Sequence, residues 1–496
     1  MKKVLTAAQL KATDEFTIDH EPIKSIDLME RASQCFVQSF MELFPNKCAV
    51  LVLVGPGNNG GDGLAIGRLL HMQGYAIQVA SLPDMNFSKD VQVNRARLGF
   101  PMKSLNEYES FESFDVIIDA LFGSGLSRPI EGQYKIVIES VNAANKTVVA
   151  VDLPSGLIPD RVQEGAAIIR ATHTLTFQSP KLTFLIPETG GYCGEVQVLD
   201  IGLDLGFIER LACHYYVIEA SDVQLAARKK FAHKGRFGHV QLFAGSKGKM
   251  GAAVLCTKAA LLSGAGLATT HIPARGESIV QISVPEAMVV LDDHQDIITN
   301  GQLLPKTNAI CIGPGIGKDR QTTAWLHTFL AEANLPMVLD ADALHILASH
   351  QELLSLVAGK AILTPHLGEL ERLLGPTKNG IERLEGSLAL AAAYDLIILI
   401  KGAHSSVVTP AGDVYFNSTG NAGMAKGGSG DVLAGLIAGF LAQGFSREEA
   451  TIKAVYLHGA AGDSAKKDLG EYSIMASDLL ERIPQAICNV SLASFI

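Results

Sequence analysis

Apolar runs that end in glycine-rich polar segments recur along this 496-residue chain and constrain its fold more than any other feature. The run Ala49–Val54 (AVLVLV) contains no polar residue and leads directly into GPGNNGGDG. A strand this apolar is buried on both faces, which is typical of a parallel sheet covered by helices on each side. The same arrangement recurs at 115–121 before FGSGLSRP and at Thr147–Val151 before DLPSG. The pattern therefore predicts an α/β fold with parallel sheets.

A second set of apolar runs follows an irregular segment at 201–234. These runs, at 239–244, 309–312, 337–339, 362–363 and 396–400, lead into GSKGKMGAA, GPGIG, DADAL, TPHLGE and KGAHS. Helical apolar spacing predicts a helical layer over 7–44, a helix over 64–73 and a helix rich in small residues that ends near Ala268. We therefore predict two α/β domains, 1–215 and 216–496.

Composition excludes several classes of protein. The net charge is −10, and no block rich in Lys and Arg offers nucleic acid or an anionic membrane a binding surface. The seven cysteines are scattered and form no CxxC pair, which argues against a disulfide framework and a zinc site. No apolar run reaches the roughly 18 residues of a membrane helix, and no signal peptide is recognisable. We expect a cytoplasmic homo-oligomer without nucleic-acid or membrane partners.

The glycine-rich stretch 417–435 (NSTGNAGMAKGGSGDVLAG) is the main candidate for a catalytic segment. Helical apolar spacing after Asp431 predicts that Gly427, Gly428 and Gly430 lie at a helix N-terminus. Free N–H groups and the helix dipole bind anions at such an end, and glycine lets a phosphate approach the main chain. A carboxylate beside a phosphate suits a base that takes a proton from an attacking hydroxyl, so we interpret Asp431 as a general base. The alternative is that Asp431 only caps the helix.

The first apolar run, its glycine loop and the following helix form a unit in which Gly55, Gly57 and Gly60 match GxGxxG. A dinucleotide dehydrogenase needs an acidic residue about twenty positions later, and residues 76–82 (AIQVASL) contain none. We therefore do not predict a nicotinamide-dependent dehydrogenase.

Ligands of open α/β sheets bind beyond the carboxyl ends of the strands. Polar side chains at three such ends are expected to converge on one crevice: Asn58, Asn59, Asp62, Asp119, Ser124, Asp152 and Ser155. For each Asn-Gly or Ser-Gly pair taken alone, an ordinary turn is the alternative.

Strand ends of the second domain carry further candidates. His366 either lines the pocket or is an ordinary hydrogen-bonded histidine. Lys401 either reaches a polyphosphate or is solvated. Asp340 and Asp342 are two residues apart and point to opposite sides of an extended strand, so a metal shared between them is not expected.

These motifs, in this order, resemble a known family over nearly the whole chain. NNGGDG, DALFGSGLSRP and VDLPSG resemble the NAD(P)H-hydrate epimerases, and GSKGKMGAA, GPGIG, TPHLGE, KGAHS and NAGMAKGGSGD resemble the fused NAD(P)H-hydrate dehydratases of the ribokinase-like superfamily. The resemblance implies a Rossmann-like three-layer αβα domain followed by a ribokinase-like α/β domain. It implies that the first domain interconverts the R and S epimers of hydrated NAD(P)H (NAD(P)HX). The second domain is then expected to dehydrate the S epimer with ADP, giving AMP and phosphate, or with ATP.

The resemblance also assigns residues. The epimerase substrate positions are Asn58, Asn59, Gly60, Gly61, Asp62, Gly123, Ser124, Gly125, Leu126, Ser127, Arg128, Pro129 and Asp152, and the potassium (K⁺) ligands are Asn59, Asp119 and Ser155. Ala252, Gly315, His366 and Asp431 match hydrate-binding positions, and Lys401, Gly402, Ala403, His404, Ser405 and Gly430 match the nucleotide site, where Mg²⁺ accompanies ADP. Lys426 departs from the family pattern of a small or hydroxyl residue before GGSGD, and it either alters nucleotide preference or is solvated.

The chemistry that the resemblance implies agrees with the interpretation of Asp431. The hydroxyl of the hydrate lies on the ring carbon bonded to N1, so its phosphorylation makes a leaving group that the nitrogen lone pair expels. Asp431 is the base for the phosphoryl step, and Asp152 moves protons while the C–O or C–N bond of that carbon breaks and re-forms. The alternative is an ordinary small-molecule kinase of the same superfamily fused to a non-catalytic binding module.

Overall fold

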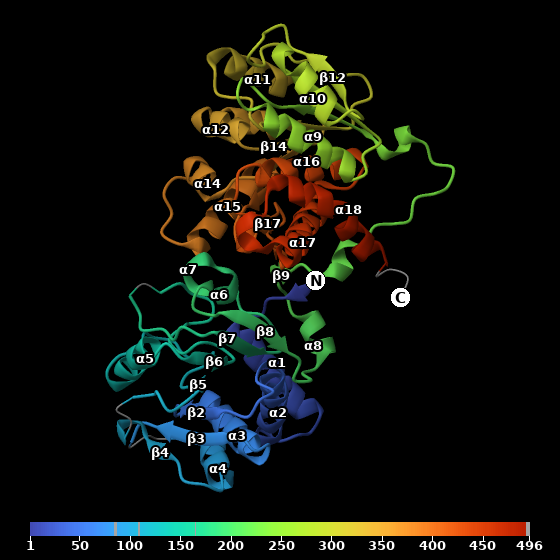
Figure 1. Ribbon diagram of the computed structural model, residues 1–496. Helices are drawn as coiled ribbons and strands as arrows, with labels where there is room; N and C mark the ends of the chain where they lie inside the picture. Colours follow the sequence, from blue (N-terminus) through green and yellow to red (C-terminus); the bar gives the residue numbers. More distant parts are fainter. Residues whose placement is uncertain (84–86, 108–109, 164, 493–496) are drawn as a thin grey trace. The chain divides into compact units, whose positions relative to one another are not determined.

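The computed structural model describes residues 1–83, 87–107, 110–163 and 165–492. The chain forms two compact units (Figure 1). The N-terminal unit comprises Lys3–Cys213 with Asn379–Ile381, and the C-terminal unit comprises Met1–Lys2, His214–Lys378 and Glu382–Ile496. None of the helices in the described part of the chain combines the length and apolar character needed to cross a lipid bilayer.

The N-terminal unit is built on a parallel sheet with the strand order β4-β3-β2-β5-β6-β7-β8. The strands are β2 (Ala49–Val54), β3 (Ala76–Ser81), β4 (Lys103–Ser104), β5 (Val116–Ala120), β6 (Thr147–Val151), β7 (His173–Phe177) and β8 (Glu195–Leu199). The helices are α1 (Ala7–His20), α2 (Ser25–Leu43), α3 (Asn58–Met72), α4 (Lys89–Arg97), α5 (Gln133–Ala143), α6 (Leu182–Leu185), α7 (Pro187–Gly190) and α8 (Leu205–Arg210), with a 3-10 turn at Leu105–Glu107. The strand order reverses between β2 and β5, which is where open α/β sheets bind ligands.

The GPGNNGGDG segment is helical from Asn58 onward, whereas the sequence predicted a helix only from residue 64. A Cβ at Gly60 would lie 2.0 Å from the carbonyl oxygen of Gly55. Glycine therefore lets the first turn of α3 pack directly on the loop that leaves β2. The consequence is that Asn58, Asn59 and Asp62 project from a helix rather than from a loop.

The C-terminal unit contains a larger mixed sheet in which the strands from β9 to β12 lie in the order β9-β18-β17-β16-β15-β14-β13-β10-β11-β12. The strands are β9 (Tyr215–Val217), β10 (His239–Phe243), β11 (Leu267–Ile272), β12 (Met288–Leu291), β13 (Ala309–Ile312), β14 (Met337–Leu339), β15 (Ala361–Leu363), β16 (Ile397–Ile400), β17 (Ser406–Val408) and β18 (Val414–Phe416); β1 is Lys2–Lys3. The strands from β16 to β12 are mutually parallel, and β17 pairs antiparallel with both β16 and β18.

The helices of this unit are α9 (Met250–Leu262), α10 (Glu277–Ser283), α11 (Arg320–Glu332), α12 (Asp342–Ser349), α13 (Leu353–Val357), α14 (Leu367–Leu374), α15 (Gly380–Tyr394), α16 (Ser429–Ala442), α17 (Arg447–Ser473) and α18 (Ala476–Leu492). Short 3-10 turns lie at Ala220–Val223, Lys234–Phe237, Ala274–Gly276 and Ala422–Met424. The prediction that the small-residue helix ends near Ala268 was wrong, because Gly264 takes a positive φ of 103° that ends α9 and the chain then forms β11. The segment 201–234 also contains α8 and β9 and is not wholly irregular.

Helix α16 occupies the core of the C-terminal unit and packs on α9 (Figure 1). Every residue from Val432 to Ala442 is buried. A Cβ at Gly435 would lie 2.2 Å from the carbonyl oxygen of Cys256 on α9, so glycine permits this close helix contact. The packing fixes the direction of α16 and therefore the position of its N-terminus, which carries Gly428, Gly430 and Asp431.

Candidate active sites

A cavity of about 750 Å³ opens beside the loops that follow β2, β5, β6 and β7 in the N-terminal unit. Predicted substrate residues that line it are Asn58, Asn59, Asp62, Gly123, Ser124, Gly125, Leu126, Ser127, Arg128 and Asp152. Gly60 and Gly61 are buried in α3, and Pro129 is exposed outside the cavity lining. The lining also includes residues of α1 and Lys181, which the sequence interpretation did not include.

Asp152 has the geometry of a functional residue. Its backbone φ is +65°, a left-handed conformation that is costly for a residue with a side chain and recurs at active sites. Its Oδ1 accepts hydrogen bonds from the backbone N–H of Phe177 at 3.1 Å and from the hydroxyl of Thr176 at 3.2 Å, and lies 2.5 Å from the Nζ of Lys181. The Lys181 side chain is 1% exposed. Since these contacts all involve Oδ1, Oδ2 has no hydrogen-bond partner among the described residues and is available to a ligand.

Two further carboxyl groups line the same cavity. Burial raises the pKa of Asp14 to about 6; the charge of Asp152 adds to the rise and Lys181 opposes it. Burial also raises the pKa of Asp62 well above its ordinary value, and the charges of Asp152 and Asp14 add to this rise. The cavity thus combines one carboxylate paired with a lysine and two carboxyl groups that keep their protons to higher pH.

Two of the three predicted potassium ligands, Asp119 and Ser155, contact each other directly. Ser155 donates from its hydroxyl to Asp119 Oδ1 at 2.6 Å and from its backbone N–H to Asp119 Oδ2 at 2.7 Å. Asn59 packs against Gly123, where an added Cβ would lie 3.0 Å from Asn59 Oδ1. The Nδ2 of Asn59 is buried without a hydrogen-bond partner among the described residues. Asn59 on α3 is therefore next to Gly123, one residue after Phe122, whose backbone N–H donates to the Ser155 hydroxyl at 2.8 Å.

Asp431 lies in the first turn of α16 but does not cap it. The N-cap is Gly428, with φ of +92° and no side-chain capping bond, so the interpretation of Asp431 as a simple cap is wrong. Burial raises the pKa of Asp431 to about 7; the charges of Asp340 and Asp342 add to the rise and Lys401 opposes it. A carboxyl group that titrates near neutral pH suits a general base.

Asp340 and Lys401 form an ion pair beside the glycine loop. Lys401 Nζ lies 2.8 Å from Asp340 Oδ1, and the Thr364 hydroxyl donates to the same oxygen at 2.7 Å. Burial would lower the pKa of Lys401, but Asp340, Glu369 and Asp431 together outweigh that effect and raise it. A Cβ on Gly430 would lie 3.4 Å from Lys401 Nζ, so the ammonium group is next to the N-terminus of α16. Lys401 is therefore a fixed charge of the site and not a solvated side chain.

The other residues predicted for the C-terminal unit lie at the same strand ends. Gly315 has φ of +68°, and a Cβ there would lie 3.1 Å from the Cβ of Ala252, so these two positions are neighbours. His366 forms a parallel bridge with Lys401 and caps α14 by accepting from the N–H of Glu369, while its side chain stays 59% exposed. Residues 402–405 form the turn after β16, in which the Gly402 N–H donates to the Ser405 hydroxyl at 3.3 Å.

Asp340 and Asp342 have separate partners, but they do not lie on an extended strand as the prediction assumed, because β14 ends at Leu339 and α12 begins at Asp342. Asp342 Oδ2 accepts from the backbone N–H of Gly317 at 2.9 Å and from Lys249 Nζ at 3.0 Å. Over the described residues, no group of three or more His, Cys, Asp or Glu side chains is placed to hold a metal ion.

Lys426 and His458 connect the glycine-rich stretch 417–435 to α17. Lys426 is exposed and donates from Nζ to the carbonyl oxygen of Tyr472 at 2.5 Å, so it is tied to the end of α17. His458 lies on α17, and its Nε2 is 3.3 Å from the hydroxyl of Ser429, the first residue of α16. Burial lowers the pKa of His458 to about 4, so this histidine is neutral at physiological pH. Sequence reasoning missed His458 because it lies within a long helix far from any motif.

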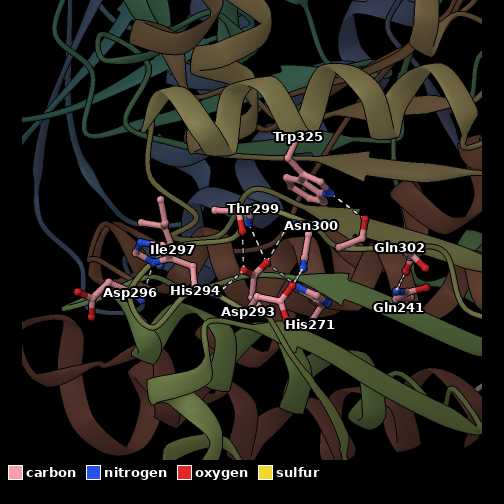
Figure 2. A network of polar contacts seen from close by, with 12 residues as sticks. Gln241, His271, Asp293, His294, Asp296, Ile297, Thr299, Asn300, Gln302 and Trp325 are labelled. Carbon is pink, nitrogen blue, oxygen red and sulfur yellow. Dashed lines mark hydrogen bonds and ion pairs between the residues drawn. The ribbon is translucent and has the colours of Figure 1, made fainter.

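A polar network holds the loop between β12 and β13 (Figure 2). Asp292 accepts hydrogen bonds from the backbone of His294, Thr299 and Asn300 and from the Thr299 hydroxyl, and it lies 3.0 Å from His271 Nε2. Burial alone would raise the pKa of Asp292, but these bonds outweigh it and lower the pKa to about 2. In Figure 2, Trp325 also points to this loop, where its Nε1 donates to the Gly301 carbonyl at 2.7 Å.

The network also supports the predicted GSKGKMGAA turn. The backbone N–H of Lys247 donates to the carbonyl oxygen of Asp296 at 2.9 Å, and Arg275 forms an ion pair with the Asp296 side chain. The Ser246 hydroxyl in turn donates to the carbonyl oxygen of Gly315 at 2.7 Å. The loop after β12 therefore braces the two glycine turns that follow β10 and β13.

Comparisons with known proteins match both units. The family model described as NAD(P)H-hydrate dehydratase matches residues 240–485, and the model described as YjeF-related protein N-terminus matches residues 25–183. A bifunctional NAD(P)H-hydrate repair enzyme of Moorella thermoacetica is 35% identical over 514 residues, covering 98% of this chain and 97% of that protein. Its counterpart in Thermofilum pendens is 32% identical over 506 residues, covering 98% and 96%.

A solved structure supports the predicted fold. The crystal structure of a ribokinase-like superfamily protein from Enterococcus faecalis is 28% identical, covers 56% of this chain and 97% of that chain, and superposes with a TM-score of 0.50. The parallel strands of the two units and this likeness confirm the α/β fold class with a ribokinase-like part.

Proposed function

The chain belongs to the family of bifunctional NAD(P)H-hydrate repair enzymes, and we propose that its N-terminal unit epimerises NAD(P)HX while its C-terminal unit dehydrates the S epimer. The separate family matches at 25–183 and 240–485 support this division of the two activities. The enzyme is thus both an isomerase and a lyase. Because epimerisation supplies the S form from the R form, the two activities together return both epimers to NAD(P)H.

The observation that carries the dehydratase assignment is Asp431 in the first turn of α16, next to the Asp340–Lys401 pair. A phosphate at this helix end would accept hydrogen bonds from the free backbone N–H groups of Gly428 and Gly430. Because glycine has no side chain, the phosphate can approach the main chain closely. Lys401 would offset the charge that develops on the transferred phosphoryl group. The same end then carries the base and the charges that stabilise the phosphoryl group.

The proposed reaction starts with the attack of the hydrate's hydroxyl on the terminal phosphorus of ADP. Asp431 takes the hydroxyl proton as the new P–O bond forms and the bond to AMP breaks. The N1 lone pair then forms a C=N bond as phosphate leaves the ring carbon, and loss of a proton from the neighbouring carbon restores the dihydropyridine. We take ADP as the phosphoryl donor because of the motif resemblance. ATP would react in the same way, with ADP as the leaving group.

Mg²⁺ is proposed to accompany the nucleotide. Asp340 and Glu369 both lie near Lys401, at 2.8 and 4.0 Å, so carboxylate oxygens that suit a hard cation are present. Among the described residues, no group of three or more His, Cys, Asp or Glu side chains is placed to hold a metal ion by itself. We therefore propose that Mg²⁺ binds mainly to the nucleotide phosphates, as it commonly does. Bound there, it would neutralise phosphate charge; the proton transfer belongs to Asp431.

Asp152 is proposed as the proton-transfer group of the epimerase, and Lys181 as the group that positions it. Asp152 lines the cavity, its Oδ2 is free, and its strained backbone supports a functional role. Asn59, Asp119 and Ser155 are proposed to hold K⁺, because their oxygens come from three elements and carry only one formal charge. That charge suits a monovalent ion better than Mg²⁺, which prefers octahedral coordination with several waters.

The test is to incubate the full chain with separated R and S epimers and with ADP, ATP or no nucleotide. We expect NAD(P)H to form from the S epimer only with nucleotide, and from the R epimer through the S epimer. Chromatography of the nucleotide products would identify AMP and phosphate as products of ADP. Accumulation of a stable phosphorylated hydrate, or no return of NAD(P)H, would contradict the proposal.

A further inference from the structure

Helix α1 brings a carboxyl group into the N-terminal cavity that belongs to none of the sequence motifs. Ala7, Leu10, Lys11 and Asp14 recur at helical spacing and line the cavity, so one face of α1 forms part of its wall. The helix is anchored at its start by a capping box between Thr6 and Gln9. Asp14 is therefore held on a rigid element, at the same cavity as Asp152.

We infer that Asp14 is a second catalytic residue of the N-terminal unit, which acts as a general acid while Asp152 acts as the base. This inference rests on the proposed epimerase function. Its geometric basis is that the two carboxyl groups enter one cavity from separate elements, α1 and the loop after β6, and that only Asp152 is paired with the buried Lys181.

The charges around Asp14 favour its protonated form. Burial raises its pKa to about 6, the charges of Asp152 and Glu15 raise it further, and Lys181 lowers it. Asp62 on α3 also faces the group and Lys11 lines the same wall. Asp152, by contrast, has Lys181 Nζ at 2.5 Å. One carboxyl group thus tends to hold a proton while its neighbour is an ion-paired carboxylate.

Inversion at the hydrated carbon by cleavage of its C–O bond uses the protonated Asp14 and the carboxylate of Asp152 together. When the C–O bond breaks, the departing hydroxyl needs a proton, and Asp14 supplies it so that water leaves. The N1 lone pair forms a C=N bond, which leaves a planar cation. A water molecule then adds to the other face of the ring, and Asp152 takes one of its protons. In total, Asp14 loses one proton and Asp152 gains one. Proton exchange with solvent then returns Asp14 to its protonated form and Asp152 to its carboxylate form.

The test compares Asp14→Asn with Asp19→Asn in the full chain. Asp19 is another carboxylate on α1, and it is exposed outside the cavity lining. We expect Asp14→Asn to lower kcat for the R epimer by about 10²-fold or more with little change in KM, and Asp19→Asn to leave both unchanged. Asp14→Glu should recover part of the rate. S-epimer dehydration by the same samples should stay normal.

The pH profile separates catalysis from structure. For the wild type, kcat/KM of epimerisation should fall above about pH 6, because Asp14 must be protonated, and Asp14→Asn should lack this fall. In water labelled with a heavy oxygen isotope, each inversion should place the label in the hydrate. Normal turnover in Asp14→Asn, or inversion without label in an active wild type, would overturn the inference. An inactive wild type would instead contradict the proposed function.

Discussion

Replacing Asp431 with Asn should abolish dehydration and at the same time stabilise the C-terminal unit at high pH. Folding raises the pKa of this carboxyl group from 3.8 to about 7, chiefly through burial and Asp340. Between these two values the folded state binds more protons than the unfolded state, so stability falls as pH rises. A rise of about three pKa units at about 1.4 kcal/mol each corresponds to at most about 4 kcal/mol lost by pH 8. Asn keeps the shape and avoids this cost.

The single tryptophan makes the stability measurement specific for this unit. Trp325 is 7% exposed on α11 in the C-terminal unit, so its fluorescence reports the unfolding of that unit in the full chain. We expect urea unfolding of Asp431→Asn and wild type to differ little near pH 4. The variant should become more stable by about 1 to 4 kcal/mol as the pH approaches 8. Other carboxyl groups also make the stability depend on pH, but they are the same in both proteins, so their effects cancel in the difference between variant and wild type.

Activity measured on the same samples completes this test. In the wild type, kcat/KM for dehydration should rise about tenfold from pH 6 to pH 8, because Asp431 must be ionised and its pKa is about 7. Asp431→Asn should lose about 10²-fold or more in kcat while nucleotide binding changes by less than about tenfold. Near-normal turnover would refute the assignment as base. If the difference in stability between Asp431→Asn and wild type does not depend on pH, the explanation that burial of the ionised Asp431 destabilises the folded state is refuted.

Three further predictions use the other parts of the sites. Asp152→Asn should slow R-epimer consumption towards its spontaneous rate and leave S-epimer dehydration intact; loss of both in a folded variant would indicate one composite site. Replacing K⁺ by tetramethylammonium at constant ionic strength should slow epimerisation, and Asp119→Ala should do the same. An epimerisation rate that does not depend on K⁺ would mean that Asp119 and Ser155 form only loop hydrogen bonds. Lys426→Ala should leave the ratio of ADP to ATP kcat/KM unchanged, because Lys426 Nζ is bound to the Tyr472 carbonyl; a changed ratio would assign it to nucleotide selection.

Sequence patterns predicted the sheets because their strands are apolar on both faces. The predicted runs 49–54, 147–151, 309–312 and 337–339 match β2, β6, β13 and β14 residue by residue. Loop and helix boundaries were less predictable where glycine permits close packing. The NNGGDG segment reads as a turn, and only the approach of Gly60 to Gly55 explains why it is helical.

Site residues could be predicted when they follow a buried strand, and they were missed when they approach from elsewhere. Asp152, Lys401 and Asp431 are next to glycine-rich motifs. Asp14 and His458 lie on helices with no motif, and they reach the sites only through tertiary packing. Lys181 also follows the end of a buried strand, β7, but no glycine-rich motif marks its segment in the sequence.

The two sites place charge in the same way although they lie in different units. In each, a lysine is paired with one aspartate: the buried Lys181 with Asp152, and the half-buried Lys401 with Asp340. Next to each pair is an unpaired carboxyl group whose pKa burial raises: Asp14 to about 6 and Asp431 to about 7. The negative charge of the paired aspartate helps to raise the pKa of its neighbour. In both units, therefore, one carboxyl group is set to exchange protons near neutral pH. The ion pair beside it differs in proposed role: Asp152 is the proposed base of the cavity, whereas Asp340 holds Lys401, the lysine proposed to bind phosphate near α16.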